Sequence, residues 1–131
     1  MPGPDPAHWL HRLTAVEWLA AAETELAHAE AALARRAARP GVTHARRAAG
    51  MAWNAVLIAK PDDPAGRSYM EHVVALSENA TLPPEIRRAA QRLRATPAMP
   101  PALITLGRPD LAPVQAARAI IDHARYVSEN G

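Results

Sequence analysis

The chain has 131 residues, 49% of them hydrophobic, which suits one domain built on one core. It has no cysteine, so disulfides and thiolate metal sites are excluded, and this fits a reducing cytoplasm. The net charge is +2, and all but one of the 15 basic residues are arginine. No apolar run approaches transmembrane length, so we expect a soluble, cytoplasmic protein with no membrane contact.

The first segment, residues 1–13, begins with three prolines at alternate positions and is predicted to be an extended N-terminal arm. A helix is predicted next, because residues 14–17 (Thr-Ala-Val-Glu) have the sequence of a capping box. Leu13 and Trp18 stand where a hydrophobic staple needs them. An apolar stripe at helical spacing follows, and residues 39–41 (Arg-Pro-Gly) are expected to end a helix of about 25 residues.

The stretch 43–60 is predicted to be the central helix of the protein. It is apolar on every face from Ala48 to Ala59, apart from Gly50 and Asn54. A helix that is hydrophobic all round must be enclosed by other helices. Asn54 should therefore be buried and hydrogen-bonded, because an unpaired buried amide costs about 1–3 kcal/mol. The proline after Lys60 ends the helix.

Three further helices are predicted to pack around this one. A second capping box at residues 68–71 begins the first, two prolines at 83–84 open the next, and the last runs from about 111 to 128. Residues 96–110 form a proline-rich connector with a short apolar patch. The predicted fold class is all-α, an antiparallel bundle of four to five helices with helix 43–60 at its centre.

Three of the predicted helices carry apolar and small residues whose order along the chain is similar to that of a known family. The residues are Trp18, Leu19, Leu26 and Leu33, then Ala45 and Ala48 to Leu57, then Ala117, Ile120, Ile121, Ala124 and Arg125. This order resembles the HEPN superfamily, small prokaryotic helical bundles that are often dimeric and often encoded beside a nucleotidyltransferase. The resemblance covers most of residues 14–128 and implies a single HEPN-like bundle at 14–131. Family members often carry an acidic residue where Gly50 stands and a lysine where Asn54 stands, so functions tied to that pair are not implied.

Arg67 and His72 are the strongest catalytic candidates. If Ser68 is the N-cap of its helix, the two residues occupy the N′ and N4 positions, which touch in a hydrophobic staple. A helix N-terminus attracts anions, so Arg67 and Ser68 could bind a phosphate. A neutral His72 beside that phosphate could act as general base toward a ribose 2′-hydroxyl. The Arg-x4-His spacing also resembles the motif of the ribonuclease branch of HEPN proteins, which implies metal-independent RNA cleavage.

The same two residues also fit a structural interpretation. Arg67 can pack over Tyr69 or pair with Glu71 or Asp63, and His72 can be a half-buried core residue. One arginine and one histidine within six residues are common in an arginine-rich chain. Burial of either side chain inside the core would favour the structural interpretation.

Arginines near the turn between the first two helices form a second candidate site. Arg46 and Arg47 begin the central helix, and Arg35, Arg36 and Arg39 end the helix before it. Together they predict a local basic patch that can contact phosphate. No aromatic residues lie among them to stack on bases, so recognition of a nucleic-acid sequence is not predicted.

The other histidines give no metal site by spacing. His8 and His11 are one helical turn apart but lack a third ligand, while His28 and His44 are expected to be exposed or solvated. His123 is placed on a different helix face from its neighbour Asp122. We therefore predict no metal and no cofactor.

Three classes of function remain open. The first is a non-catalytic interaction module or RNA- or nucleotide-associated component of a prokaryotic defence or toxin-antitoxin type system. The alternative is a metal-independent endoribonuclease using Arg67 and His72, and the third class is a helical small-ligand binder. A homodimer is expected because apolar residues lie outside the main stripes, namely Trp9, Leu103, Ile104 and Leu106. The resemblance adds a nucleotidyltransferase, an antitoxin and RNA as possible partners.

Overall fold

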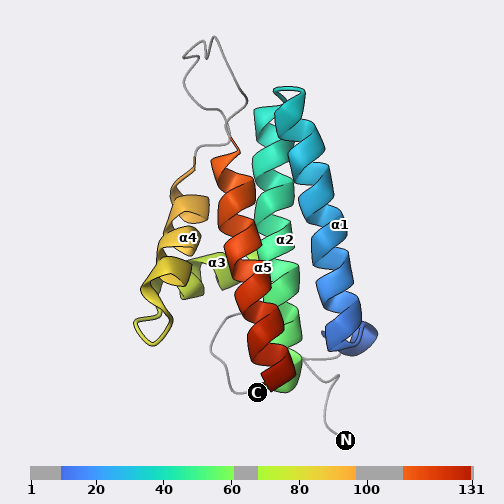
Figure 1. Cartoon of the computed structure of the whole chain (residues 1–131), viewed down its shortest axis with the longest axis vertical. Coiled ribbons are helices and arrows are strands. Elements are labelled where there is room, and N and C mark those ends of the chain that lie inside the picture. The colour runs from blue at the N-terminus through green and yellow to red at the C-terminus, as the bar shows by residue number, and fades with distance from the viewer. Residues whose placement is uncertain (1–9, 61–67, 97–110, 131) are drawn as a thin grey trace, which may run out of the picture.

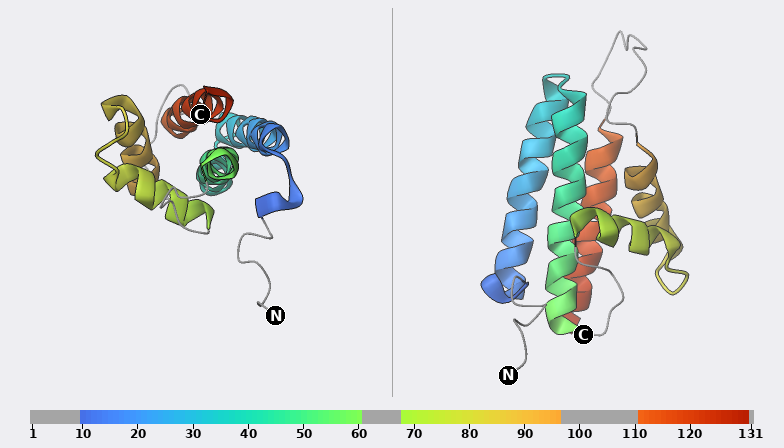
Figure 2. Two further views of the ribbon diagram at one scale, coloured as in Figure 1. Left: turned by 90° about the horizontal axis from the view of Figure 1, so that it is seen from below. Right: turned by 180° about the vertical axis from the view of Figure 1, so that it is seen from behind.

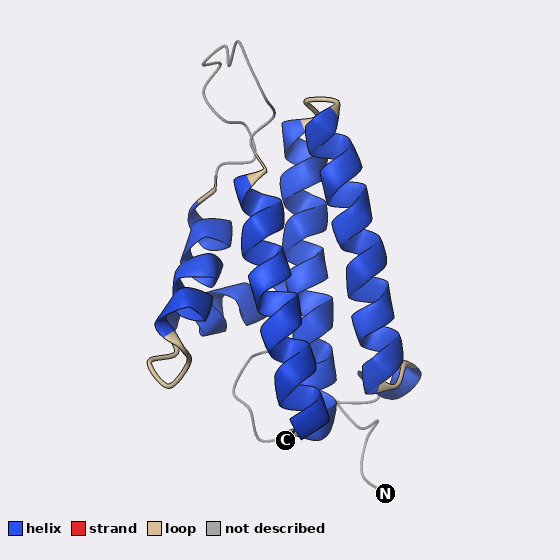
Figure 3. Cartoon of the chain, viewed as in Figure 1, coloured by secondary structure: helices blue, strands red, loops and turns tan. Residues whose placement is uncertain are grey.

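The computed structural model describes residues 10–60, 68–96 and 111–130, and all regular structure in these ranges is helical (Figure 3). A short 3-10 helix, η1 (Leu10–Arg12), precedes five α-helices. These are α1 (Ala15–Ala34), α2 (Ala38–Ala59), α3 (Tyr69–Glu78), α4 (Pro84–Ala95) and α5 (Ala112–Asn130) (Figure 1). The prediction of an all-α fold is confirmed.

Helix α2 occupies the centre of the bundle and packs against every other described helix (Figure 2). Helices α1 and α2 are antiparallel neighbours, as expected. The predicted antiparallel order does not extend to the whole bundle, because α5 runs alongside α2 in the same direction (Figure 1). The short helix α3 lies across the long helices (Figure 2). Helices α3 and α4 come between α2 and α5 in the chain, and α4 runs opposite to both of them, so that α5 again takes the direction of α2 (Figure 1).

One hydrophobic core joins all five helices. Each contributes at least one large side chain that is no more than 2% exposed, namely Trp18, Trp53, Leu76, Leu93 and Ile120. Burial of one such side chain stabilises the fold by about 1.5–3 kcal/mol. All residues of α2 from 48 to 57 are buried, which confirms that this stretch is enclosed on every side.

The start of α1 is fixed by the residues that the sequence identifies. Thr14 and Glu17 form the predicted capping box, with each side chain bonded to the other's backbone N–H. The indole N–H of the buried Trp18 donates to the carbonyl of Leu10 at 2.7 Å. Leu10–Arg12 are therefore a 3-10 turn rather than part of an extended arm, because a buried indole N–H needs an acceptor. Residues 1–9, including Trp9, lie outside the described residues.

The turn between α1 and α2 comes earlier than predicted. Helix α1 ends at Ala34, and α2 begins at Ala38 rather than at residue 43. Arg36 has a φ of 62°, and the N–H groups of Arg36 and Ala37 bond back to Leu33 and Ala32, as in a Schellman motif. Glycine usually occupies this left-handed position, so an arginine there gives no signal in the sequence.

Pro40 and Gly41 lie inside α2 instead of ending α1. Proline is tolerated in the first turn of a helix, where its missing N–H has no intrahelical partner. Gly41 lies so close to Leu33 that a Cβ would come within 2.5 Å of that side chain. Gly41 therefore allows the close contact of α1 with α2.

The remaining helix boundaries agree closely with the sequence. Ser68 caps α3, Pro84 opens α4, and α5 begins and ends within two residues of its predicted limits. The apolar patch Leu103–Leu106 lies outside the described residues. None of the described helices is long and apolar enough to span a lipid bilayer.

Candidate functional site

His72 lies inside the core, where α3 crosses α2. Its ring has no exposed surface, and its Nε2 is 2.8 Å from Oδ1 of Asn54 on α2. Asn54 is equally buried, so the prediction that it is buried and hydrogen-bonded is confirmed. Its Nδ2 group has no hydrogen-bond partner among the described residues. Arg67 lies outside those residues, and the structure therefore does not test its contact with His72.

The capping box at the start of α3 determines where His72 points. Ser68 Oγ accepts a hydrogen bond from the N–H of Glu71, and Glu71 Oε2 accepts one from the N–H of Ser68. This arrangement fixes the first turn and directs the N4 position toward the core. The carboxylate of Glu71 also occupies the region where an anion would approach the free amides. The helix start already has a negative partner, which opposes phosphate binding at Ser68.

Arg46 and Arg47, the second predicted phosphate site, have different surroundings. Arg46 donates from Nε to the carbonyl of Leu93 at 2.9 Å and from a terminal nitrogen to that of Thr96 at 2.6 Å. Its guanidinium thus satisfies the last carbonyls of α4, and burial lowers its pKa. Arg47 is exposed and lies 3.8 Å from a carboxylate oxygen of Glu25. The two cations do not converge on one point.

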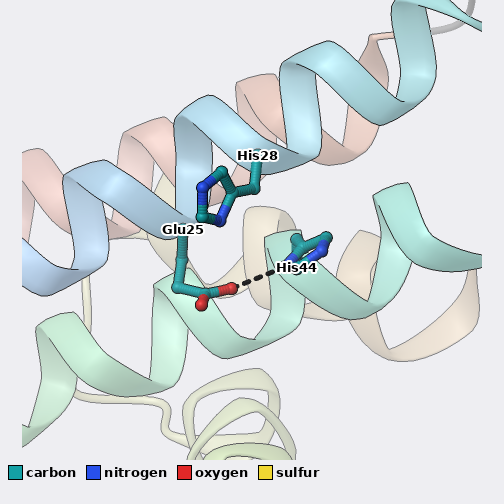
Figure 4. A group of neighbouring side chains, drawn as sticks. All are labelled: Glu25, His28 and His44. Atoms are coloured by element: carbon teal, nitrogen blue, oxygen red, sulfur yellow. Dashed lines mark hydrogen bonds and ion pairs between the residues drawn. The ribbon is translucent and has the colours of Figure 1, made fainter.

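A cluster that the sequence analysis did not predict lies between α1 and α2. Glu25 and His28 of α1 point toward His44 of α2 (Figure 4). His44 Nδ1 is 2.7 Å from Glu25 Oε2, and the two imidazole rings meet edge to face with centroids 5.4 Å apart. One ligand atom from each of the three residues lies within 4.8 Å of the others. His28 is exposed, while Glu25 and His44 are partly buried.

The sequence alone indicates that two members of this cluster lie near each other. Glu25 and His28 are three residues apart, so they share one face of a helix. Their partner depends on the position of the turn. A turn at residues 40–42 would place His44 opposite the end of α1, whereas the observed turn centres on Arg36. Residues 28 and 44 are equally far from Arg36 along the chain and therefore face each other.

A shallow groove between α4 and α5 carries exposed arginines. It is lined by Glu85, Arg88 and Arg92 of α4, Gln115 of α5, and three alanines from the two helices. Arg88 and Arg92 are one helical turn apart and exposed, and neither forms an ion pair within the described part of the chain. Glu85 at the same groove reduces its positive potential.

No family model, no curated protein and no solved structure matches this chain.

Proposed function

We propose that this chain is a HEPN-like helical bundle that acts as a non-catalytic interaction module. The burial of His72 on Asn54 supports the proposal most directly. A general base must come within hydrogen-bond distance of the hydroxyl that it deprotonates. A ribose could reach this ring only if α3 moved away from α2. The alternative, an endoribonuclease using Arg67 and His72, therefore requires a rearranged core.

The first partner that we propose is a second copy of the chain, and the wider setting is a prokaryotic defence or toxin-antitoxin type system. HEPN proteins are often dimeric and often accompany a nucleotidyltransferase. Two large apolar side chains are mostly exposed here, Val16 at 76% and Tyr126 at 65%. They lie near the start of α1 and the end of α5, and Figure 1 shows these two helix ends at the same end of the bundle. Sedimentation should therefore give a dimer at micromolar concentration, and a monomer would contradict this partner.

One observation favours an RNA-associated role as the second candidate. Arg88 and Arg92 are exposed, lie one turn apart and border a groove. Guanidinium groups bind phosphate oxygens in bidentate fashion, so this pair can contact an RNA backbone without reading its sequence. Arg46, which the sequence placed in a phosphate site, is instead bonded to the end of α4.

A single experiment on RNA separates these functions. Untagged protein is mixed with labelled single-stranded RNA, and both binding and cleavage are followed. The non-catalytic proposal predicts intact RNA, whereas cleavage that His72→Ala abolishes in a folded protein would overturn it. If the groove binds RNA, the double change Arg88→Gln and Arg92→Gln should weaken binding and reduce its salt dependence by up to about two counterions. As a control, Arg12→Gln removes one positive charge from an exposed arginine of η1 outside the groove and should leave binding nearly unchanged, whereas Arg92→Gln alone should weaken it.

A further inference from the structure

We propose that Glu25, His28 and His44 bind one zinc ion between α1 and α2. Their side chains offer two imidazole nitrogens and one carboxylate oxygen. Imidazole is a ligand of zinc and other late transition metals, whereas calcium and magnesium select oxygen ligands. Two histidines and one glutamate form a known zinc ligand set that leaves the fourth position to water or to a further group. This site is independent of the groove and of His72.

The positions of the side chains require little movement to bind the ion. In a tetrahedral zinc site the ligand atoms lie about 2.0–2.1 Å from the metal and thus roughly 3.3 Å from one another. Here one candidate atom from each residue lies within 4.8 Å of the others, and the closest pair, His44 Nδ1 and Glu25 Oε2, is 2.7 Å apart. Small side-chain rotations would bring all three onto one ion.

The packing of α1 against α2 already brings these three side chains close together. Glu25 and His28 lie on one face of α1 (Figure 4), and α2 packs against that helix along its length (Figure 1). The His28 side chain is exposed, and that of His44 is 29% exposed, so both rings can rotate without repacking the core. Glu25 is more enclosed, with 13% of its side chain exposed, and its direct contact with His44 orients the carboxylate.

One neighbouring charge opposes the ion. Arg47 lies 3.8 Å from Glu25 Oε1, the oxygen that does not contact His44. The Arg47 side chain is 46% exposed, so water screens much of its repulsion. Three ligands with a cation nearby predict an affinity in the micromolar range rather than that of a closed four-ligand structural site.

Zinc titration of the full chain, with no histidine tag and after treatment with a chelator, tests the proposal. We expect calorimetry to show one ion per chain, and Co²⁺ to give the visible absorption of a tetrahedral complex that zinc abolishes. Glu25→Gln, His28→Ala and His44→Ala should each weaken zinc binding by at least about tenfold. His28→Ala is decisive if the other variants fold poorly, because His28 is exposed.

Two matched changes serve as controls. Glu30→Gln alters an exposed glutamate of the same helix, and His11→Ala alters an exposed histidine of η1. Both should bind zinc like the unchanged chain. The proposal is overturned if zinc does not saturate the protein below millimolar concentration, or if His28→Ala binds as tightly as the controls.

Discussion

Asn54 and His72 are polar side chains with no exposed surface, and they are joined by a hydrogen bond of 2.8 Å. Each side chain is the hydrogen-bond partner of the other across the α2–α3 contact. Removing one side chain leaves the remaining polar atom without that partner in the core, which costs about 1–3 kcal/mol in addition to the lost packing. The hydrogen bond between the two side chains therefore favours the observed crossing of α3 over α2, because another crossing would leave both polar groups buried without each other.

A double-mutant cycle measures this coupling. Asn54→Ala and His72→Ala should each lower the free energy of unfolding by about 2 kcal/mol or more, and the double variant should lose less than the sum of the two. Urea denaturation of the four proteins provides the comparison. Strict additivity would show that the hydrogen bond between the two side chains contributes nothing to stability.

For single residues, the sequence predicted those roles that depend only on neighbouring positions in the chain. Both capping boxes and the burial of Asn54 follow from short patterns, and they are observed. Whether His72 would be exposed or buried could not be predicted, because a side chain at the N4 position can face either a bound phosphate or the core. The contact of Arg46 with α4 depends on residues 47 and 50 positions away in the chain, which no local pattern contains.

At the scale of whole helices, two glycines allow α2 to approach its neighbours closely. A Cβ on Gly50 would lie 2.5–2.7 Å from Tyr69 atoms that include its Cα, so the backbone of α3 would have to move. A Cβ on Gly41 would meet the Cγ and Cδ2 atoms of Leu33 at 2.5 Å, the far end of a flexible side chain. Similar close distances therefore have different consequences for packing.

The two glycine-to-alanine changes form a matched pair. Alanine gains up to about 1 kcal/mol of helix propensity at each position. Gly50→Ala should nevertheless lower the free energy of unfolding by about 1–3 kcal/mol, because a backbone must shift. Gly41→Ala should lower the free energy of unfolding less than Gly50→Ala does, by a margin of about 1 kcal/mol or more, because Leu33 can change rotamer. Equal thermal and urea stability of the two variants would contradict this account of the α2–α3 crossing.

Helix boundaries show where sequence patterns lose information. Prolines and serines begin helices by known local rules, so the starts of α3 and α4 were predictable. The end of α1 depends on Arg36 in a left-handed conformation, which many residue types adopt only when the surrounding packing requires it. Because the turn was predicted several residues too late, the sequence did not indicate that His28 and His44 face each other. The cluster of Glu25, His28 and His44 was therefore not predicted.

Across the whole molecule, the all-α class and the enclosed central helix followed from composition and periodicity. The direction of α5 relative to α2 did not, since a long connector permits either direction. Helix α5 is fixed by two kinds of contact. Its fully buried Ile120 and Ile121 face the core, and its Arg118 and Arg125 bind Glu23 of α1 at 2.7 and 3.0 Å.

The ion pairs and the apolar contacts should differ in size and in pH dependence. Hydrogen bonds from Arg118 hold the pKa of Glu23 below its ordinary value of 4.5, and Arg125 acts in the same direction. A carboxylate with a lowered folded pKa stabilises the protein above its unfolded pKa, and this stability is lost as the pH falls through the folded pKa. The side chains of this network are 35–44% exposed, so water screens their interaction.

Glu23→Gln should therefore lower the free energy of unfolding by less than about 1 kcal/mol at neutral pH. The difference from the unchanged chain should shrink as the pH is lowered below 4.5 toward the folded pKa of Glu23. Ile121→Ala should cost about 2–5 kcal/mol, with little dependence on pH, because it opens a cavity and removes no charge. Urea denaturation of the three proteins at neutral and acidic pH compares the two effects. A larger loss for Glu23→Gln than for Ile121→Ala would mean that charge, rather than the shared core, attaches the last helix to the first two.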